Sequence, residues 1–340
     1  MNETIVIHAP NDISIVDVDI PTPKAGEALL KLLYGGICGS DLNIYKGNFA
    51  YGTYPRIPGH EFAAQIVSIG KNDRGLQEGM NVFANPYFNC GTCYACERKL
   101  FNCCLHNQTM GVQRDGAFSK YIVMPVDRLF DAHDLDPRLI SLIEPFCIGY
   151  HGIHRAQVQP SDNVLIIGAG SIGILAALAA EKAGARVYIC DISEWKIKYV
   201  EKHFTFAGSF QFKEVRQFLS EVEKITKENK FDVVVEAVGS PETFDAAVRA
   251  TAYGGRVVLI GVSKKSLDFE FTMIQTKELN IYGSRNALDK DFIESYALIS
   301  KHQEEFLPLI THTYQFPDAN QAFFDLAHNN GTMLKTIIEF

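Results

Sequence analysis

The chain has 340 residues, of which 47% are hydrophobic and 21% charged, a composition typical of globular proteins rather than disordered or fibrous ones. This length exceeds the roughly 100–200 residues of a single domain, so we expect two domains. The net charge is -8 and the sequence has no local run of Lys or Arg that could bind phosphates. Nucleic acid is therefore not an expected partner.

The sequence shows no targeting or membrane-spanning signal. Residues Met1–Ile7 lack the basic start, long apolar core and small-residue cleavage site of a secretory signal. The longest apolar stretches, such as Ile174–Ala180, are far shorter than the ~20 residues that a membrane-spanning helix needs. We therefore expect a cytoplasmic protein without a membrane partner.

The amino-terminal part of the chain has the pattern of an irregular β-rich domain. Short apolar runs alternate there with turns that contain Gly and Pro, which favours short strands. The expected strands are 5–7, 13–18, 28–33, 62–69, 81–84 and 118–123.

From about residue 160, strands alternate with helices. The alternation favours a parallel sheet with helices on both faces, which is the doubly wound α/β arrangement. The expected strands are 163–167, 186–190, one within 204–212, 231–236, 256–261 and 279–282. The expected helices are 172–183, 194–203 and 241–252.

The carboxy-terminal segment breaks the alternation. Its expected elements are helices at 290–301 and 319–329 and strands at 312–316 and 335–339. We therefore expect a catalytic domain over 1–149, a dinucleotide-binding domain over 150–286, and a return to the catalytic domain over 287–340.

A Gly-x-Gly-x-x-Gly motif lies between an expected strand and an expected helix. Gly168 permits the tight turn, Gly170 lets the backbone approach a pyrophosphate, and Gly173 lets the helix pack close to the strand. The helix amino terminus that starts at Ser171 and Ile172 offers free N–H groups to the phosphates. The alternative is a glycine turn in an ordinary α/β domain.

The acidic residue that ends the next strand favours NAD as the dinucleotide. Asp191 can accept hydrogen bonds from the adenosine ribose hydroxyls, and its carboxylate would repel a 2′-phosphate. No arginine follows it until Arg216. We therefore expect NAD rather than NADP.

Five of the eight cysteines lie within 15 residues, a poor layout for a disulfide framework in a large intracellular chain. The spacing of Cys90, Cys93, Cys96 and Cys104 suits a tetrahedral Zn²⁺ with no open coordination position, hence a structural site. Free or redox-active thiols are the alternative, and the adjacent Cys103 could replace Cys104 as a ligand.

A second set of possible ligands is dispersed along the chain. Cys38, His60, Glu61 and Glu144 offer a thiolate, an imidazole and two carboxylates. A single buried Cys or His is more often part of a core than a metal ligand. The coexistence of these residues with the cysteine cluster and the glycine motif favours a catalytic metal.

These motifs, in this order, resemble the zinc-containing medium-chain alcohol and polyol dehydrogenases over essentially the whole chain. The motifs are Gly-Ile-Cys-Gly-Ser-Asp (36–41), Gly-His-Glu (59–61), the four-cysteine cluster, Ile-Glu-Pro (143–145) and Gly-Ala-Gly-Ser-Ile-Gly (168–173). The glutamate of Ile-Glu-Pro is similar to that of the sorbitol, threonine and sugar-acid dehydrogenases. The segment 277–285 resembles the bacterial RspB-like and L-galactonate dehydrogenase subgroup. The implied fold is a β-rich GroES-like catalytic domain combined with a Rossmann domain.

The resemblance also implies roles for individual residues. Cys38, His60 and a carboxylate, either Glu61 or Glu144, would hold the catalytic zinc, and Ser40 would take the substrate proton. The family positions that contact or close over the cofactor correspond to Ala237, Gly261, Arg285 and Lys335.

The implied function is zinc-dependent transfer of hydride from a secondary hydroxyl of a polyol or sugar acid, such as a hexonate, to NAD⁺. Two zinc ions per subunit and a homodimer or homotetramer are expected. The alternatives are a zinc-dependent dehydrogenase of another alcohol and a non-catalytic relative that binds nicotinamide as a regulator.

The sequence departs from the family pattern at Asn43. Many relatives place a histidine there to pass the substrate proton to solvent, and an amide cannot take up and release a proton in this pH range. We expect the proton to leave through ordered water or the cofactor ribose. Substrate specificity is expected from the loops 49–54 and 106–114, with Arg114 or Arg285 available for a substrate carboxylate.

Overall fold

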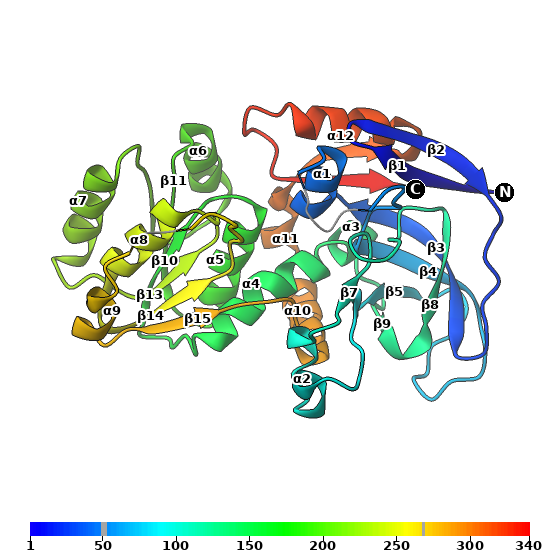
Figure 1. Cartoon of the computed structure of the whole chain (residues 1–340), viewed down its shortest axis with the longest axis horizontal. Coiled ribbons are helices and arrows are strands. Elements are labelled where there is room, and N and C mark those ends of the chain that lie inside the picture. Colours follow the sequence, from blue (N-terminus) through cyan, green and yellow to red (C-terminus); the bar gives the residue numbers. More distant parts are fainter. Residues whose placement is uncertain (49–52, 267–268) are drawn as a thin grey trace. The chain divides into compact units, whose positions relative to one another are not determined.

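The computed structural model describes residues 1–48, 53–266 and 269–340. They form two compact units, one of Met1–Glu144 with Leu288–Phe340 and one of Pro145–Ala287 (Figure 1). The units divide after Glu144 and after Ala287, close to the positions 149 and 286 expected from the sequence, and the expected domain limits stay predictions.

The first unit is built on a mixed sheet with the strand order β16-β17-β3-β4-β5-β9, in which β8 also pairs with β3. Two small antiparallel sheets, β1-β2 and β6-β7, accompany it. The strands are β1 (Asn2–Ala9), β2 (Asp12–Val18), β3 (Glu27–Gly36), β4 (Glu61–Ile69), β5 (Asn81–Ala84), β6 (Tyr87–Phe88), β7 (Gln108–Thr109), β8 (Tyr121–Pro125), β9 (Leu129–Asp131), β16 (Ile310–Gln315) and β17 (Lys335–Glu339).

The first unit also contains helices, and the chain passes from the first unit into the second within α4 (Ile143–Arg155). The other helices of the unit are α1 (Gly39–Tyr45), α2 (Tyr94–Glu97), α3 (Pro137–Ile140), α10 (Asp289–Lys301), α11 (Gln303–Phe306) and α12 (Ala319–Ala327), with single 3₁₀ turns at Phe101–Cys103, Val126–Arg128, Leu307–Leu309 and Phe316–Asp318.

The carboxy-terminal segment completes the first unit. Strand β17 pairs antiparallel with β3, with Ile337 opposite Gly36, and β16 pairs parallel with β17. Ile338 and Phe323 of this segment lie in the same buried core as Leu30 of β3. Apolar burial therefore joins the two ends of the chain in one core.

The second unit is a six-stranded parallel sheet with the order β12-β11-β10-β13-β14-β15. The order reverses between β10 and β13, as in a doubly wound Rossmann sheet. The strands are β10 (Asn163–Ile167), β11 (Arg186–Asp191), β12 (Gly208–Gln211), β13 (Phe231–Glu236), β14 (Thr251–Leu259) and β15 (Asn280–Gly283). The helices are α5 (Ser171–Lys182), α6 (Glu194–His203), α7 (Val215–Thr226), α8 (Pro241–Ala250) and α9 (Thr272–Thr276).

Central strands of this sheet are continuous apolar runs because helices cover both faces. Leu165 and Ile167 share a buried core with residues of α7 and α8, whereas Ile166 on the other face lies near the start of α5. The helix α7 falls outside the expected ranges. Its buried Phe218 and Val222 are four residues apart, which is the helical spacing that would have revealed it.

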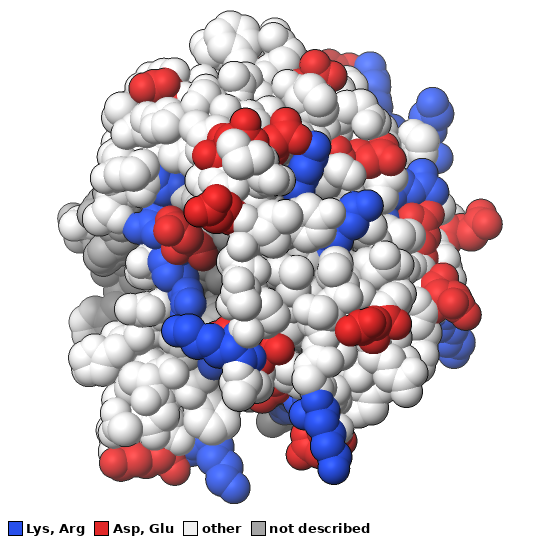
Figure 2. Space-filling model, turned by 90° about the vertical axis from the view of Figure 1, so that its right-hand side faces the viewer, with Lys and Arg blue, Asp and Glu red and all other residues white. Residues whose placement is uncertain are grey.

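Within the described ranges, no helix is long and apolar enough to cross a membrane. On the face that Figure 2 shows, basic side chains are interspersed with acidic ones rather than gathered in one large patch. The absence of a nucleic-acid partner stays a prediction.

Candidate active site

Asp41 links the two segments that carry the dispersed ligands. Its buried carboxylate accepts hydrogen bonds from the amide of Cys38 at 2.9 Å and from the amide of Gly59 at 3.0 Å. Its Oδ1 also lies 4.0 Å from Nδ1 of His60. One carboxylate at the start of α1 therefore holds the Cys38 turn against the turn before β4, a role not expected from the sequence.

Two glycines permit the close packing around this site. Gly59 has φ +98°, and a Cβ there would lie 2.1 Å from the Phe118 ring. A Cβ on Gly36, which is paired with Glu61 across β3 and β4, would lie 2.3 Å from Oε2 of Glu61. The Glu61 carboxylate therefore occupies the space that the absent side chain of Gly36 leaves.

The structure brings three of the dispersed ligands together. One donor atom each from Cys38, His60 and Glu61 lies within 4.8 Å of the others. A thiolate, an imidazole and a carboxylate form a donor set suited to catalytic zinc with an open position. Nδ1 of His60 is buried and has no hydrogen-bond partner among the described residues. The residues fit a zinc ion.

The electrostatics of this cluster also favour a cation. Burial lowers the pKa of His60, but the charges of Cys38, Asp41 and Glu144 outweigh burial and raise it well above its usual value. The acidic groups around the imidazole therefore favour a positive charge at this position, which a bound cation would also supply.

Glu144 lies beside the cluster rather than in it. The Tyr87 hydroxyl donates a hydrogen bond to Oε1 of Glu144, which is buried near the start of α4. Burial raises the pKa of Glu144 to about 7; the charge of Glu61 adds to the rise, and those of His60 and Lys335 oppose it. Tyr87 was not expected in the site, because only the fold brings it to Glu144.

Lys335 contacts the cluster of Cys38, His60 and Glu61. Its Nζ donates to Oε1 and Oε2 of Glu61 at 2.8 and 2.6 Å, and to the carbonyl of Ile37 at 3.5 Å. Burial lowers the pKa of Lys335, but the charges of Glu61 and Cys38 outweigh burial and raise it. The expected cofactor contact of Lys335 stays a prediction, and its observed partner is Glu61.

Ser40 has a buried hydroxyl oxygen without a hydrogen-bond partner among the described residues. It precedes Asp41 in α1, where Asn43 is exposed to solvent. The Ser40 hydroxyl is therefore available for a ligand next to the Cys38 turn.

The four expected structural ligands form one cluster. The Sγ distances are 3.6 Å for Cys93–Cys96, 3.9 Å for Cys93–Cys104 and 3.6 Å for Cys90–Cys104. Four sulfurs that each lie ~2.3 Å from a tetrahedral Zn²⁺ are about 3.8 Å apart, so the cluster matches this geometry. Cys103 is exposed and is not part of the cluster.

The glycine turn has the expected form in the second unit. Gly168 has φ +107°, and a Cβ on Gly173 would lie 1.7 Å from the carbonyl oxygen of Gly168. Asp191 ends β11 and accepts hydrogen bonds from the amides of Ala169 and Ser193, both at 2.8 Å. These bonds fix the carboxylate beside the glycine turn.

The other expected cofactor residues are divided between the two units. Ala237 and Gly261 follow β13 and β14 at the same edge as the glycine turn, and Arg285 follows β15. All three lie in the second unit, whereas Lys335 lies in the first.

The loops expected to set substrate specificity are partly described. Residues 49–52 lie outside the described part of the chain. In the second loop, the guanidinium carbon of Arg114 lies 3.6 Å from the centre of the Phe88 ring, so stacking positions this side chain.

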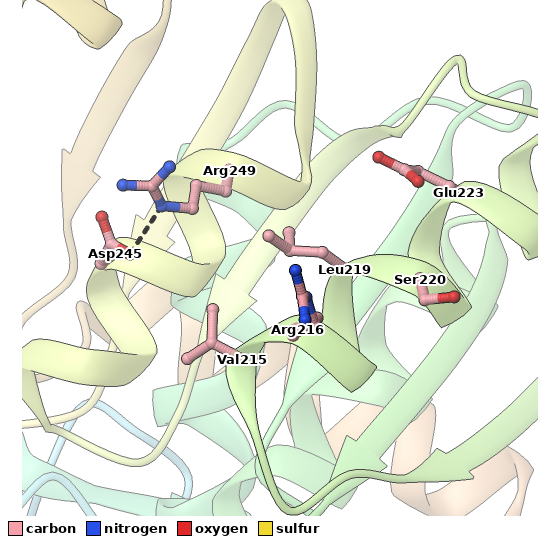
Figure 3. A pocket seen from close by; sticks show the side chains of 7 residues that line it. All are labelled: Val215, Arg216, Leu219, Ser220, Glu223, Asp245 and Arg249. Carbon is pink, nitrogen blue, oxygen red and sulfur yellow. Dashed lines mark hydrogen bonds and ion pairs between the residues drawn. The ribbon is translucent and has the colours of Figure 1, made fainter.

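A groove of about 540 Å³ is lined by side chains of α7 and α8 (Figure 3). Arg216 and Leu219 of α7 line it together with Asp245 and Arg249 of α8, which are hydrogen-bonded to each other. It contains none of the expected site residues.

Both parts of the chain match models of known protein families. Residues 24–134 match the model of the alcohol dehydrogenase GroES-like domain, and residues 171–301 match that of the zinc-binding dehydrogenases.

The chain is 32% identical to L-galactonate-5-dehydrogenase of Escherichia coli K12, over 99% of this chain and 98% of that protein. It is similar to the structure of RspB of E. coli CFT073 complexed with NADH, with a TM-score of 0.90, 29% identity, and coverage of 100% of this chain and 99% of that one. A zinc-binding dehydrogenase of Sinorhizobium meliloti bound to NADP has a TM-score of 0.90 at 26% identity, with the same coverage.

Proposed function

The chain belongs to the zinc-containing medium-chain alcohol dehydrogenase family, and from this premise we propose that it oxidises a secondary hydroxyl of a polyol or sugar acid with NAD⁺. The matches to the two family models confirm the expected family and the expected fold class, a GroES-like domain with a Rossmann domain. The substrate class is supported by the likeness to L-galactonate-5-dehydrogenase.

The observation that carries the proposal is the cluster of the half-buried Cys38 with the buried His60 and Glu61, next to the hydroxyl of Ser40, which has no partner among the described residues. We assign Glu61 as the third zinc ligand because its carboxylate, unlike that of Glu144, belongs to the compact cluster. The complete ligand set argues against a metal-free regulatory relative.

Zinc, once bound, supplies a Lewis acid that lowers the pKa of the substrate hydroxyl. Ser40 relays the proton that the hydroxyl loses: its oxygen, which has no competing partner among the described residues, accepts this proton while its own hydroxyl proton is passed on. Asp41 keeps the Cys38 and His60 segments in register, and Tyr87 orients Glu144 beside them. The proton then leaves Ser40 through water or the cofactor ribose, since Asn43 cannot relay it.

The proposed dinucleotide is NAD, with its pyrophosphate at the amino terminus of α5. The proposal is supported by Asp191, which is buried beside the glycine turn and would repel a 2′-phosphate. The Nζ of Lys196 lies 3.3 Å from Oδ2 of Asp191 and reduces this repulsion. The preference for NAD over NADP is therefore tested by a direct comparison of the two cofactors.

The test is a screen of C5–C6 polyols and aldonic acids with NAD⁺ or NADP⁺, followed by the absorbance of the reduced cofactor, on protein of measured zinc content. We expect turnover with a secondary alcohol of this class and NAD⁺. The variant Ser40→Ala should retain zinc and NADH binding but lose turnover by at least about 100-fold. Zinc-replete protein that turns over none of these compounds would refute the substrate class.

A further inference from the structure

Glu236 is a buried carboxylate at the last position of β13. Its Oε1 accepts hydrogen bonds from the amides of Val238 and Gly239, at 2.9 and 2.8 Å, and from the hydroxyl of Thr243 at 2.8 Å. One oxygen atom thus satisfies three donors and fixes the turn that leads from β13 into α8.

This turn is packed tightly against the loop that follows β14. A Cβ on Gly261 would lie 2.2 Å from the amide nitrogen of Gly239 and 2.5 Å from Oε2 of Glu236. Gly239 has φ +82°, and a Cβ there would lie 2.6 Å from backbone atoms of Val262. The position of the 261–262 loop therefore depends on the turn that Glu236 holds.

The same turn contacts the glycine turn after β10. A Cβ on Gly168 would lie 2.8 Å from the Val238 side chain, and the amide of Ala237 donates to the carbonyl of Ile167 at 3.0 Å. Strands β10 and β13 flank the point where the strand order reverses, and ligands of such sheets bind in the crevice at this point.

We infer that Glu236 is a positioning residue for the dinucleotide, an inference that rests on the proposed cofactor. Glu236 holds residues 237–239 in the crevice, and through them it sets the spacing between the glycine turn and the 261–262 loop. Without an acceptor at Oε1, two amides and a hydroxyl lose their partner, and the turn must rearrange to satisfy them.

The experiment compares Glu236→Gln with Glu236→Met by titration of NADH fluorescence. Gln keeps a carbonyl oxygen that can accept the three bonds, so its NADH Kd should stay within about threefold of wild type. Met has a similar volume but no acceptor, so its Kd should rise by about tenfold or more. The KM for NAD⁺ should rise more than kcat falls, and the zinc content should not change.

Two further variants separate positioning from general stability. Thr243→Val removes one donor from Oε1 and should raise the Kd by a smaller factor of about three. Lys277→Met is the control, because Lys277 donates to the carbonyls of Val248 and Thr251 at the opposite end of α8. It should lower the Tm without changing the Kd.

An unchanged Kd in Glu236→Met, or an equal rise in Lys277→Met at a similar loss of Tm, would overturn the inference. Wild-type protein that binds zinc but no NADH would instead overturn the proposed cofactor. The two failures are therefore distinguishable.

Discussion

Lys335 holds both carboxylate oxygens of Glu61, with its Nζ 2.8 Å from Oε1 and 2.6 Å from Oε2. Both side chains are almost completely buried, at 4% and 1% exposure. Because Glu61 also belongs to the candidate zinc cluster, a lysine and a metal ion would share the same carboxylate.

Removal of the Lys335 charge should therefore have opposite effects on folding and on metal binding. In Lys335→Met the buried Glu61 loses its partner, so the metal-free protein should lose about 3 kcal/mol of unfolding free energy. The zinc ion should bind more tightly, because the cluster becomes more negative. Denaturant unfolding of zinc-free protein and competition with a chelator measure the two effects.

The matched control for this prediction is Lys335→Arg, which keeps the charge and offers a fork of donors to both Glu61 oxygens. It should stay closer to wild type in both measurements. Weaker zinc binding in Lys335→Met than in wild type would contradict the shared-carboxylate interpretation.

The four-cysteine cluster should hold its own zinc independently of the candidate catalytic site. Replacement of the buried Cys104 by Ser removes one of four thiolates, so the zinc content should fall from two to one per chain and the Tm should decrease. The neighbouring Cys103→Ser is the control and should keep both ions. Metal analysis and calorimetry of the two variants check this; equal zinc loss in both would show that the fourth ligand is wrong.

The lack of a titratable side chain at position 43 should limit how fast the substrate proton leaves Ser40. In Asn43→His, an imidazole with a pKa near ~6.5 becomes available on the exposed side of α1, so kcat should rise and its pH profile should gain an ionisation near that value. Asn43→Gln, which cannot titrate, should keep the wild-type profile. A pH series of kcat is the measurement, and identical profiles for all three proteins would argue against a relay at this position.

A hydrogen bond between β16 and α12 should make the stability depend on pH. Tyr314 donates to Oδ2 of Asp325 at 2.6 Å, and Gln321 donates to Oδ1 at 2.7 Å. These bonds lower the pKa of Asp325, whereas burial, together with Asp325, raises the pKa of Tyr314 to about 12.

The two shifts define the pH window of this contribution. Because the pKa of Asp325 is lower in the folded state, its carboxylate stabilises the fold at pH values above the unfolded pKa of about 4. This contribution is lost as the pH falls through the folded pKa. Because the pKa of Tyr314 is higher in the folded state, its protonated hydroxyl stabilises the fold at pH values below the unfolded pKa of about 10. This contribution is lost as the pH rises towards 12. Tyr314→Phe should therefore lower the Tm at neutral pH, with a difference from wild type that shrinks at acidic and alkaline pH. A constant Tm difference from pH 3 to pH 11 would show that the hydrogen bond is not responsible.

The sequence alone determined the features whose parts lie close together along the chain. The cysteine cluster spans residues 90–104 and the glycine turn 168–173, so the local spacing of ligands and glycines already specifies their geometry. The strands 163–167 and 231–236 were predicted with the observed limits, because each contains a short apolar run, 164–167 and 233–235, as buried parallel strands do.

Only the tertiary structure decided which partners complete each site. Lys335 is 274 residues from Glu61, and Tyr87 is 57 residues from Glu144, and no local pattern links the members of either pair. Asp41 and Glu236 are similar, since their roles depend on amides of neighbouring turns that a side-chain motif does not reveal. A buried charge needs a partner, but the sequence does not state which one, because the return of β17 to β3 and the packing of the sheet bring the two together.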